Sequence, residues 1–508
     1  KPTALHFPLN TQKENSIVAN MSSIGDIVMP EYDSSMPAGG NPLAMDVNAQ
    51  YQGLEFHYVY QMLTAFFVFL IIPGLGLLYG GMSQRKSALA MMFQSFAVIS
   101  VIAFQWMFWG FSLTFSRTAN SFIGNMDNFG LRGVMAAPSN GSVLIPDIVF
   151  CLYQMLFAMT AAAIVVGGAF ARGKIIPSMI FLFFWVTIVY CPIASWTWNA
   201  NGWAYNLGVL DFAGGSPVHM STGAAGLAYA LVLGKRRSAI DNTHHKPHNL
   251  TTMFIGTLLI FAGWFGFNGG SALNASMRSM VAVFNTIVGG SMGLVGYTVI
   301  SYFKHNRKWS VKAACEGIIA GLVGITPAAG YVQPWLAVVI GILTGAGCCS
   351  LEGLHNWIGI DDGLEVFKLH GIGGAIGSFL TGCFATSKIS ALDGLGTEAS
   401  GAIDGNGIQI AYQLADICAT LSYSFVVSCI LLFALEYIPF MGLRVSEEAE
   451  EMGLDLDQFH DEAADGWEDY PLATRTISHG IAPHQITGAS SPDGSLTPQR
   501  QEKQEPKA

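Results

Sequence analysis

The sequence predicts an all-helical membrane protein, because it is rich in apolar residues, poor in charge and divided into long apolar runs. Of its 508 residues, 51% are hydrophobic and only 11% are charged, and the mean hydropathy is +0.43. In soluble domains about a quarter of the residues are charged. A helix needs about 20 apolar residues to cross a bilayer, and charge-free runs of that length recur along the chain. We therefore expect a multi-pass protein whose surroundings are the lipid bilayer.

Eleven transmembrane helices are predicted between residues 58 and 440. Eight of them are apolar runs that contain no charged residue except Asp416, at about 58–84, 87–116, 148–171, 175–198, 212–234, 249–277, 279–303 and 409–435.

The other three helices are less regular. The charge-free stretch 317–351 carries Pro327 and Pro334 on either side of a Gly-Tyr turn, so it predicts parts of two helices. The first of these two helices begins near Val311. A further helix is expected at about 366–385.

Basic residues predict how the helices are oriented. The loops after helices one, three, five and seven hold eleven Lys and Arg residues, whereas the alternate loops hold four. Because basic loops stay in the cytosol, we expect the N-terminus outside the cell and the C-terminal tail inside.

The two ends of the chain are polar. Residues 1–57 form a predicted extracellular segment without the apolar core of a cleavable signal peptide. After the membrane domain, 58–440, we expect a cytosolic segment at 441–473 and a disordered tail at 474–508. From residue 441 onward there are 14 acidic and five basic residues, so most of the net charge of −10 belongs to the tail. We expect no nucleic-acid partner.

Two histidines lie inside predicted membrane helices. His219 follows the acid Asp211 in an apolar run that ends at Lys235, and His370 lies in the helix at 366–385. A titratable ring is costly inside a membrane, so such residues are functional candidates by default. Two of them suggest a proton-handling pore. The alternatives are histidines that only pack and a metal site, but zinc needs at least three protein ligands and we find no third. The eight cysteines show no CxxC spacing, and we expect no metal and no cofactor.

The positions of the histidines suggest internal symmetry. They fall in the fifth and tenth helices, as expected for two inverted five-helix halves followed by one further helix.

Several motifs resemble those of the ammonium transporter family, the Amt, Mep and Rh proteins. They are the stretch 211–237, Gly263-Trp-Phe-Gly-Phe-Asn-Gly-Gly-Ser271, Gly321-Leu-Val-Gly-Ile-Thr-Pro-Ala-Ala-Gly330 and His370-Gly-Ile-Gly-Gly374. Tyr190-Cys-Pro-Ile-Ala194 and Lys246-Pro-His248 are most similar to fungal ammonium permeases. The likeness covers about residues 50 to 460. It implies a plasma-membrane homotrimer in which each subunit takes up ammonium and methylammonium, with high affinity, through its own pore.

The resemblance also implies roles for residues outside the histidine pair. Trp198, Tyr153 and Ser271 match the positions that recruit ammonium in the family. Cation–π contacts would contribute roughly 0.5 to 2 kcal/mol each, although Trp198 also fits an aromatic residue of the membrane interface. Phe157 and Phe267 match the two rings that close the pore, and the alternative is ordinary helix packing.

Two acidic residues lie at the start of the fifth predicted helix and within the eleventh. Asp211 is expected to cap the start of the helix that contains His219, and attraction of a cation is the second interpretation. Asp416, in the last helix, is assigned no role.

The cytosolic segment resembles a regulatory element of the family. Ser446 and Ser478 are candidate phosphorylation sites, which suggests a kinase or signalling partner at the tail. Two other functions stay open, a transporter that also senses ammonium and an Rh-like gas channel. An enzyme is not expected, because Ser221 and His219 point to different sides of a helix and no Ser-His-acid group accompanies them.

Overall fold

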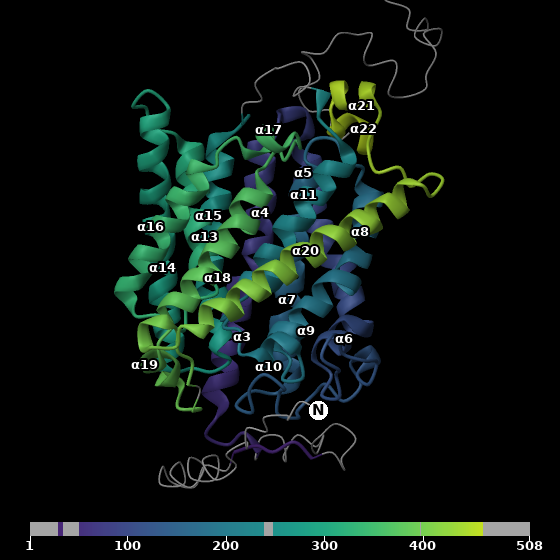
Figure 1. The fold of residues 1–508 in the computed structure, drawn as a ribbon. Helices are drawn as coiled ribbons and strands as arrows, with labels where there is room; N and C mark the ends of the chain where they lie inside the picture. Colours follow the sequence, from purple (N-terminus) through teal and green to yellow (C-terminus); the bar gives the residue numbers. More distant parts are fainter. Residues whose placement is uncertain (1–28, 34–49, 238–246, 397, 461–508) are drawn as a thin grey trace, which may run out of the picture. The chain divides into compact units, whose positions relative to one another are not determined.

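The computed structural model describes residues 29–33, 50–237, 247–396 and 398–460. Within these ranges the regular structure is helical, apart from two isolated β-bridges (Figure 1). Ser478 and the predicted tail at 474–508 lie outside the described residues, as does most of the predicted segment 1–57.

The first five predicted membrane helices each contain a break or a change of helix type. They are built from α3 (Glu55–Phe69) and α4 (Ile71–Met82), from α5 (Ala88–Gln105), η2 (Trp106–Gly110) and α6 (Phe111–Phe115), from α7 (Asp147–Val165) and η4 (Val166–Ala169), from α8 (Ile175–Trp185), η5 (Val186–Tyr190) and α9 (Cys191–Trp198), and from η6 (Gly215–Met220) and α11 (Ser221–Leu233).

The later helices are more continuous. They are α13 (Leu250–Gly269), α14 (Met277–Lys304), α15 (Val311–Ile325), α16 (Pro334–Ser350), η8 (Phe367–Ile372) with α18 (Gly373–Phe384), and α20 (Ile408–Glu436). Short helical turns join them or follow them, namely η1 (Arg85–Ser87), η3 (Phe129–Leu131), α10 (Trp203–Leu207), η7 (Gly270–Ala272), α17 (Leu354–Ile358), α19 (Ser387–Ser390), η9 (Ala391–Asp393), η10 (Ala402–Asp404), α21 (Glu447–Met452) and α22 (Leu454–Gln458).

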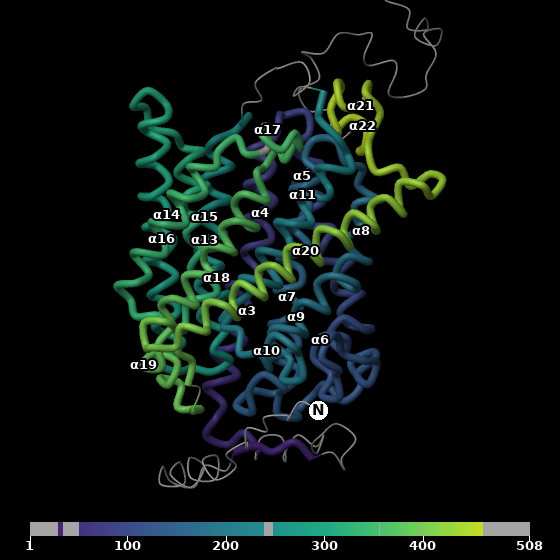
Figure 2. Tube along the Cα trace, in the orientation of Figure 1, coloured from purple at the N-terminus to yellow at the C-terminus, as the bar shows by residue number. Residues whose placement is uncertain are grey.

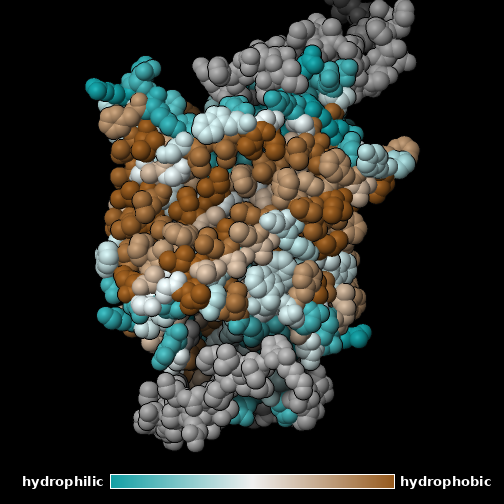
Figure 3. All heavy atoms as spheres, in the orientation of Figure 1, coloured by the Kyte–Doolittle hydropathy of each residue, from teal (hydrophilic) through white to brown (hydrophobic). Residues whose placement is uncertain are grey.

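Helices therefore occupy every position at which the sequence predicts a membrane span. Seven helices of the described chain are long and apolar enough to cross a membrane, and an eighth is added if α18 and the turn after it, bent by 95°, count as one span. The face shown in Figure 3 has an apolar band between two polar ends, as lipid surroundings require. The protein is thus a helical membrane protein, and the full count of eleven spans stays a prediction.

The last long helix, α20, positions the helix that contains His219. It runs obliquely across its neighbours and packs against α11 and α18 (Figures 1 and 2). Its buried face is polar and forms hydrogen bonds with the fifth helix and with the residues that lead into it. Gln413 Nε2 donates to the carbonyl of Leu210 at 2.8 Å, and Ser424 Oγ donates to the carbonyl of Ser221 at 2.6 Å. These bonds hold the chain on either side of η6.

Candidate functional site

Both histidines lie in π-helical turns, and the fold brings their rings together. His219 belongs to η6 and His370 to η8. Their Nδ1 atoms are 3.3 Å apart although 151 residues separate them in the chain. The exposed fraction is zero for His219 and 5% for His370. A π-helical turn is uncommon and frequently marks a functional site.

The hydrogen bond between the rings determines what each ring offers to a third molecule. A neutral imidazole has one N–H donor and one acceptor nitrogen. If the two Nδ1 atoms share one proton, one ring therefore keeps an acceptor Nε2 and the other keeps an Nε2–H donor. His219 Nε2 is buried and has no hydrogen-bond partner among the described residues. The pair is thus able to bind a small molecule that both donates and accepts.

A carboxylate anchors the start of each π-helical turn. Asp211 accepts hydrogen bonds from the backbone N–H groups of Gly214 and Gly215, both at 2.8 Å, and of Ser216 at 2.7 Å. Gly214 has a φ of +109°, a conformation that glycine adopts without strain. In the other half, Asp362 accepts from the N–H of Phe367 at 2.9 Å.

Sequence reasoning missed Asp362, although a signal was present. Asp211 and Asp362 each lie eight residues before a histidine, at His219 and His370 respectively. This repeated spacing is a sign of two related halves, in addition to the positions of the histidines in the fifth and tenth helices.

A series of aromatic ring contacts leads from Trp198 to the histidine pair. Phe157 and Phe267 stack with ring centroids 4.0 Å apart and planes 10° from parallel, and both are buried. On one side, Trp198 meets Phe157 edge to face at 5.9 Å. On the other side, Phe267 lies 6.1 Å from the ring of His219. The structure therefore connects Trp198 to His219 through successive contacts with the two predicted gate residues.

Hydroxyl groups lie next to the stacked rings. The Tyr153 hydroxyl donates to the backbone carbonyl of Phe267 at 2.6 Å and lies 3.3 Å from the hydroxyl of Ser271. Ser271 donates to the same carbonyl at 2.9 Å, which leaves its oxygen lone pairs available as acceptors. Trp198 donates its ring N–H to the carbonyl of Asp211 at 3.2 Å, so its orientation is fixed by the segment that leads into η6.

A narrow cavity continues beyond the histidine pair. Its volume is about 20 Å³, enough for one or two molecules of the size of water. His370 lines it together with apolar residues of α4, α7, α13 and α15. The charged residues of its wall are Lys312 and Glu316.

Asp416 makes a helix–helix contact. It is fully buried and accepts a hydrogen bond from the hydroxyl of Ser216, three residues before His219. The Thr420 hydroxyl lies 3.5 Å from its other oxygen. Asp416, to which the sequence assigned no role, thus joins α20 to η6.

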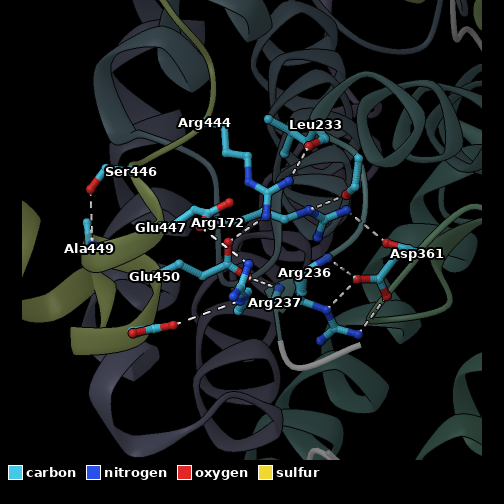
Figure 4. A network of polar contacts seen from close by, with 12 residues as sticks. Arg172, Leu233, Arg236, Arg237, Asp361, Arg444, Ser446, Glu447, Ala449 and Glu450 are labelled. Atoms are coloured by element: carbon cyan, nitrogen blue, oxygen red, sulfur yellow. Dashed lines mark hydrogen bonds and ion pairs between the residues drawn. The ribbon is translucent and has the colours of Figure 1, made fainter. Parts of the chain in front are cut away.

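The residues after α20 fold back onto the end of α11 and the basic residues that follow it, at Leu233 and Arg237 (Figure 4). Glu450 accepts from Arg444 at 2.7 Å and from the backbone N–H of Arg237 at 2.5 Å. Ser446 lies in this segment and is exposed. Its hydroxyl caps α21 by accepting a hydrogen bond from the N–H of Ala449 at 3.1 Å.

The same network contains a buried ion pair. Arg236 donates to both oxygens of Asp361, at 2.8 and 2.7 Å. Burial alone would raise the pKa of Asp361, but the hydrogen bonds and charge of Arg236 hold it well below its usual range. The neighbouring Arg172 is buried as well, and burial lowers its pKa to about 10, so it stays protonated at neutral pH.

Comparison with known proteins gives a consistent result. The profile of the Ammonium Transporter Family matches residues 59–464. Ammonium transporter 1 of Schizosaccharomyces pombe is 47% identical over 418 residues, which are 82% of this chain and 83% of that protein. Ammonium transporter MEP2 of Saccharomyces cerevisiae is 43% identical over 478 residues, which are 91% of this chain and 95% of that protein.

The fold agrees with these sequence matches. The crystal structure of Saccharomyces cerevisiae Mep2 superimposes with a TM-score of 0.77 at 44% identity, and the match covers 83% of this chain and 96% of that one. The resemblance seen in the motifs is thereby confirmed. The chain belongs to the ammonium transporter family, whose members are membrane transporters and not enzymes.

Proposed function

We propose that the protein takes up ammonium and methylammonium across the plasma membrane, with high affinity, through a hydrophobic pore that contains two histidines. The observation that carries this proposal is the buried contact between His219 and His370 behind the stacked rings of Phe157 and Phe267. Membership of the ammonium transporter family supports the substrate.

Ammonium would first bind outside the ring pair. The ion is small, positively charged and rich in N–H donors. The face of Trp198 attracts a cation, and the free lone pairs of the Ser271 hydroxyl accept a hydrogen bond. Tyr153 contributes by holding Ser271 and the Phe267 carbonyl in place.

The ion would then lose its proton, because a bare cation cannot cross a dry stretch cheaply. Isolating a unit charge in a medium of low dielectric constant costs on the order of tens of kcal/mol, and neutral ammonia avoids most of this cost. The N–H bond of ammonium breaks, its proton passes to an acceptor nitrogen of the histidine pair, and ammonia crosses as a neutral molecule. On the cytosolic side the proton and ammonia recombine. Potassium has no proton to release, so this route rejects it.

The proposed assembly is a homotrimer with a pore in each subunit. Each subunit would have eleven spans arranged as two inverted halves plus one helix, with the N-terminus outside and the tail in the cytosol. The halves are supported by the repeated eight-residue spacing from aspartate to histidine and by the π-helical turns η6 and η8. The orientation is supported by the contacts of the C-terminal segment with basic loops at Lys86 and Arg237.

The position of Ser446 favours a second function, regulation of transport by phosphorylation. The exposed position of Ser446 at the start of α21, beside acidic residues, suits a phosphorylation switch and a kinase or signalling partner. A transporter that also senses ammonium is therefore the second candidate, and an Rh-like gas channel is the third.

Alanine substitution of either histidine tests the mechanism. We expect His219→Ala and His370→Ala to admit water to the dry stretch, with loss of ammonium uptake or with a potassium current that the wild type lacks. The measurement is methylammonium uptake in cells without permeases of their own, together with membrane current in ammonium and in potassium from pH 5 to 8. His219→Glu serves as the matched variant, because a carboxyl group also accepts and passes protons, and we expect activity with a changed pH profile.

Wild-type rates and ion selectivity in both alanine variants would contradict the mechanism, since the histidines would then only pack. A wild-type protein that carries no methylammonium at all would contradict the proposed function itself.

A further inference from the structure

A lysine is buried immediately beside the turn that contains His370. Lys368 lies two residues before His370 in η8, and its side chain is only 2% exposed. Its Nζ donates to the hydroxyl of Tyr297 at 2.8 Å, lies 3.5 Å from Glu316 Oε2 and contacts the carboxylate of Glu365. A charge inside a membrane protein costs several kcal/mol unless it is paired and hydrogen-bonded, and Lys368 is both.

A second lysine closes the group, which we name the inner charge cluster (Tyr297, Lys312, Glu316, Glu365 and Lys368). Lys312 Nζ lies 3.2 Å from Glu316 Oε1 and 3.5 Å from Glu365 Oε1. Two lysines therefore balance two glutamates, and the Tyr297 hydroxyl bridges by donating to Glu316. The cluster ties together α14, α15 and the segment that enters η8.

The backbone at the entrance of η8 is strained, and the cluster holds it. Glu365 has a φ of +53°, a left-handed conformation that is strained for a residue other than glycine. Such a conformation persists only where the surroundings fix it. Here the Glu365 carboxylate is bound by both lysines, while Asp362 binds the N–H of Phe367 at 2.9 Å and Cys348 Sγ donates to the Lys368 carbonyl at 3.4 Å.

The first half of the protein has no equivalent of this lysine. Pro217 stands two residues before His219, and η6 is instead held by Asp416 through Ser216. The inner charge cluster thus acts on one histidine alone. It also borders the cavity beyond the pair, since Lys312 and Glu316 line that cavity together with His370.

We propose that Lys368 is a positioning residue, which anchors the π-helical turn η8 to α14 and α15 and so keeps His370 in hydrogen-bonding distance of His219. The inference rests on the proposed function, because it assigns a role to Lys368 in the selectivity of that same pore. A hydrogen bond of 3.3 Å is close to the limit of useful length, so even a small shift of η8 breaks it. Water then enters the dry stretch, and potassium follows.

The test compares three substitutions at and around Lys368. Lys368→Met keeps the length of the side chain and removes its charge. Lys368→Met combined with Glu365→Gln leaves one lysine and one glutamate, so it restores charge balance without restoring the anchor, and it keeps the test valid if the single variant fails to fold. Lys368→Arg keeps both the charge and the hydrogen-bond donors.

We expect the ratio of ammonium current to potassium current to fall at least tenfold in the neutral double variant, with a changed pH profile between pH 5 and 8. Lys368→Arg should recover most of the wild-type ratio. Lys304→Met is the matched control, because Lys304 binds the carbonyls of Cys349 and Ser350 at the end of α16 and lies outside the cluster. Its ratio should equal that of the wild type.

Wild-type selectivity and pH profile in the neutral double variant would overturn the inference and leave the proposed function standing. Absence of any ammonium-dependent current in the wild type would overturn both.

Discussion

Among single residues, Asp211 holds the start of the helix that contains His219. Its carboxylate accepts hydrogen bonds from three backbone N–H groups at the start of η6, three to five residues before His219. A capping residue contributes about 0.5–2 kcal/mol, and each buried N–H left without a partner costs about 1–3 kcal/mol. The contribution of Asp211 to the free energy of unfolding should therefore lie at the upper end of the usual range for a capping residue.

Substitution of Asp211 separates its two interpretations. We expect Asp211→Ala to lower the melting temperature of the purified protein and to remove most uptake, because three N–H groups lose their acceptor. Asp211→Asn keeps one acceptor oxygen and removes the charge, so a cap predicts partial retention of both stability and uptake. The measurements are thermal unfolding in detergent and methylammonium uptake normalised to surface protein.

An Asn variant with wild-type stability but with the uptake of the Ala variant would instead show that the charge attracts the cation. Equality of both variants with the wild type would rule out either role.

The sequence allowed prediction of residues whose chemistry is unusual for their surroundings. A histidine inside an apolar run is conspicuous whatever the fold, and the family motifs led to Phe157 and Phe267. The inner charge cluster was not predictable in this way. Lys368 was visible as a charge near a helix end, but its partners Tyr297 and Glu316 come from helices 71 and 52 residues away. Only the packing of α14 and α15 against η8 brings these side chains together.

Among the helices, the closest approach relevant to the site joins α11 to η8. A Cβ atom at Gly223 would lie 2.2 Å from the backbone nitrogen of Gly371 and 2.5 Å from its Cα. Two glycines thus allow the helices that contain the histidines to touch. Hydrophobicity predicted these helices from the sequence, but it did not predict the π-helical turns within them, because an inserted residue changes the direction of side chains without changing the apolar character of the run.

Gly223→Ala should disturb both the fold and the pore. Because the contact is made by backbone atoms on both sides, one helix must shift, at a cost of about 1–3 kcal/mol or more. We expect a lower melting temperature and a loss of methylammonium uptake. Gly407→Ala is the matched control, since a Cβ atom there meets nothing within 4 Å, and it should leave both measurements unchanged. An active, stable Gly223→Ala protein would show that the helices tolerate a wider spacing.

On the scale of the whole molecule, the C-terminal segment acts as a cap for helices far earlier in the chain. Asp455 accepts from the N–H groups of Leu89 and Ala90 at the start of α5, at 3.1 and 2.7 Å. Gln458 accepts from the N–H of Ile175 at the start of α8 at 3.2 Å. The end of the chain thereby holds the ends of two helices that pack against each other.

The buried ion pair of Arg236 and Asp361 should stay intact over the pH range of the transport measurements. The pKa of Asp361 in the folded protein lies below its value in the unfolded chain, which is about 3.9. Its contribution to stability is therefore complete above that value and is lost only as the pH falls toward the pKa of the folded state. Between pH 5 and 8 the pair with Arg236 stays intact, so a changed pH profile in that range has another origin.

Removal of the C-terminal segment tests its regulatory role. Truncation after Arg444 removes Glu450 and Asp455, so α5 loses its cap and the loop at Arg237 loses its acidic partner. The truncation also removes the exposed ion pairs of Arg237 with Glu447 and Glu451, and such pairs contribute only about 0–1 kcal/mol each. We expect lower uptake per transporter, with a deficit that varies with the nitrogen supply of the cells. Truncation after His460 keeps α21 and α22 and is the matched control, for which uptake should match the full chain. Unchanged uptake after truncation at Arg444, under every nitrogen supply, would show that the segment closes the inner end without controlling the pore.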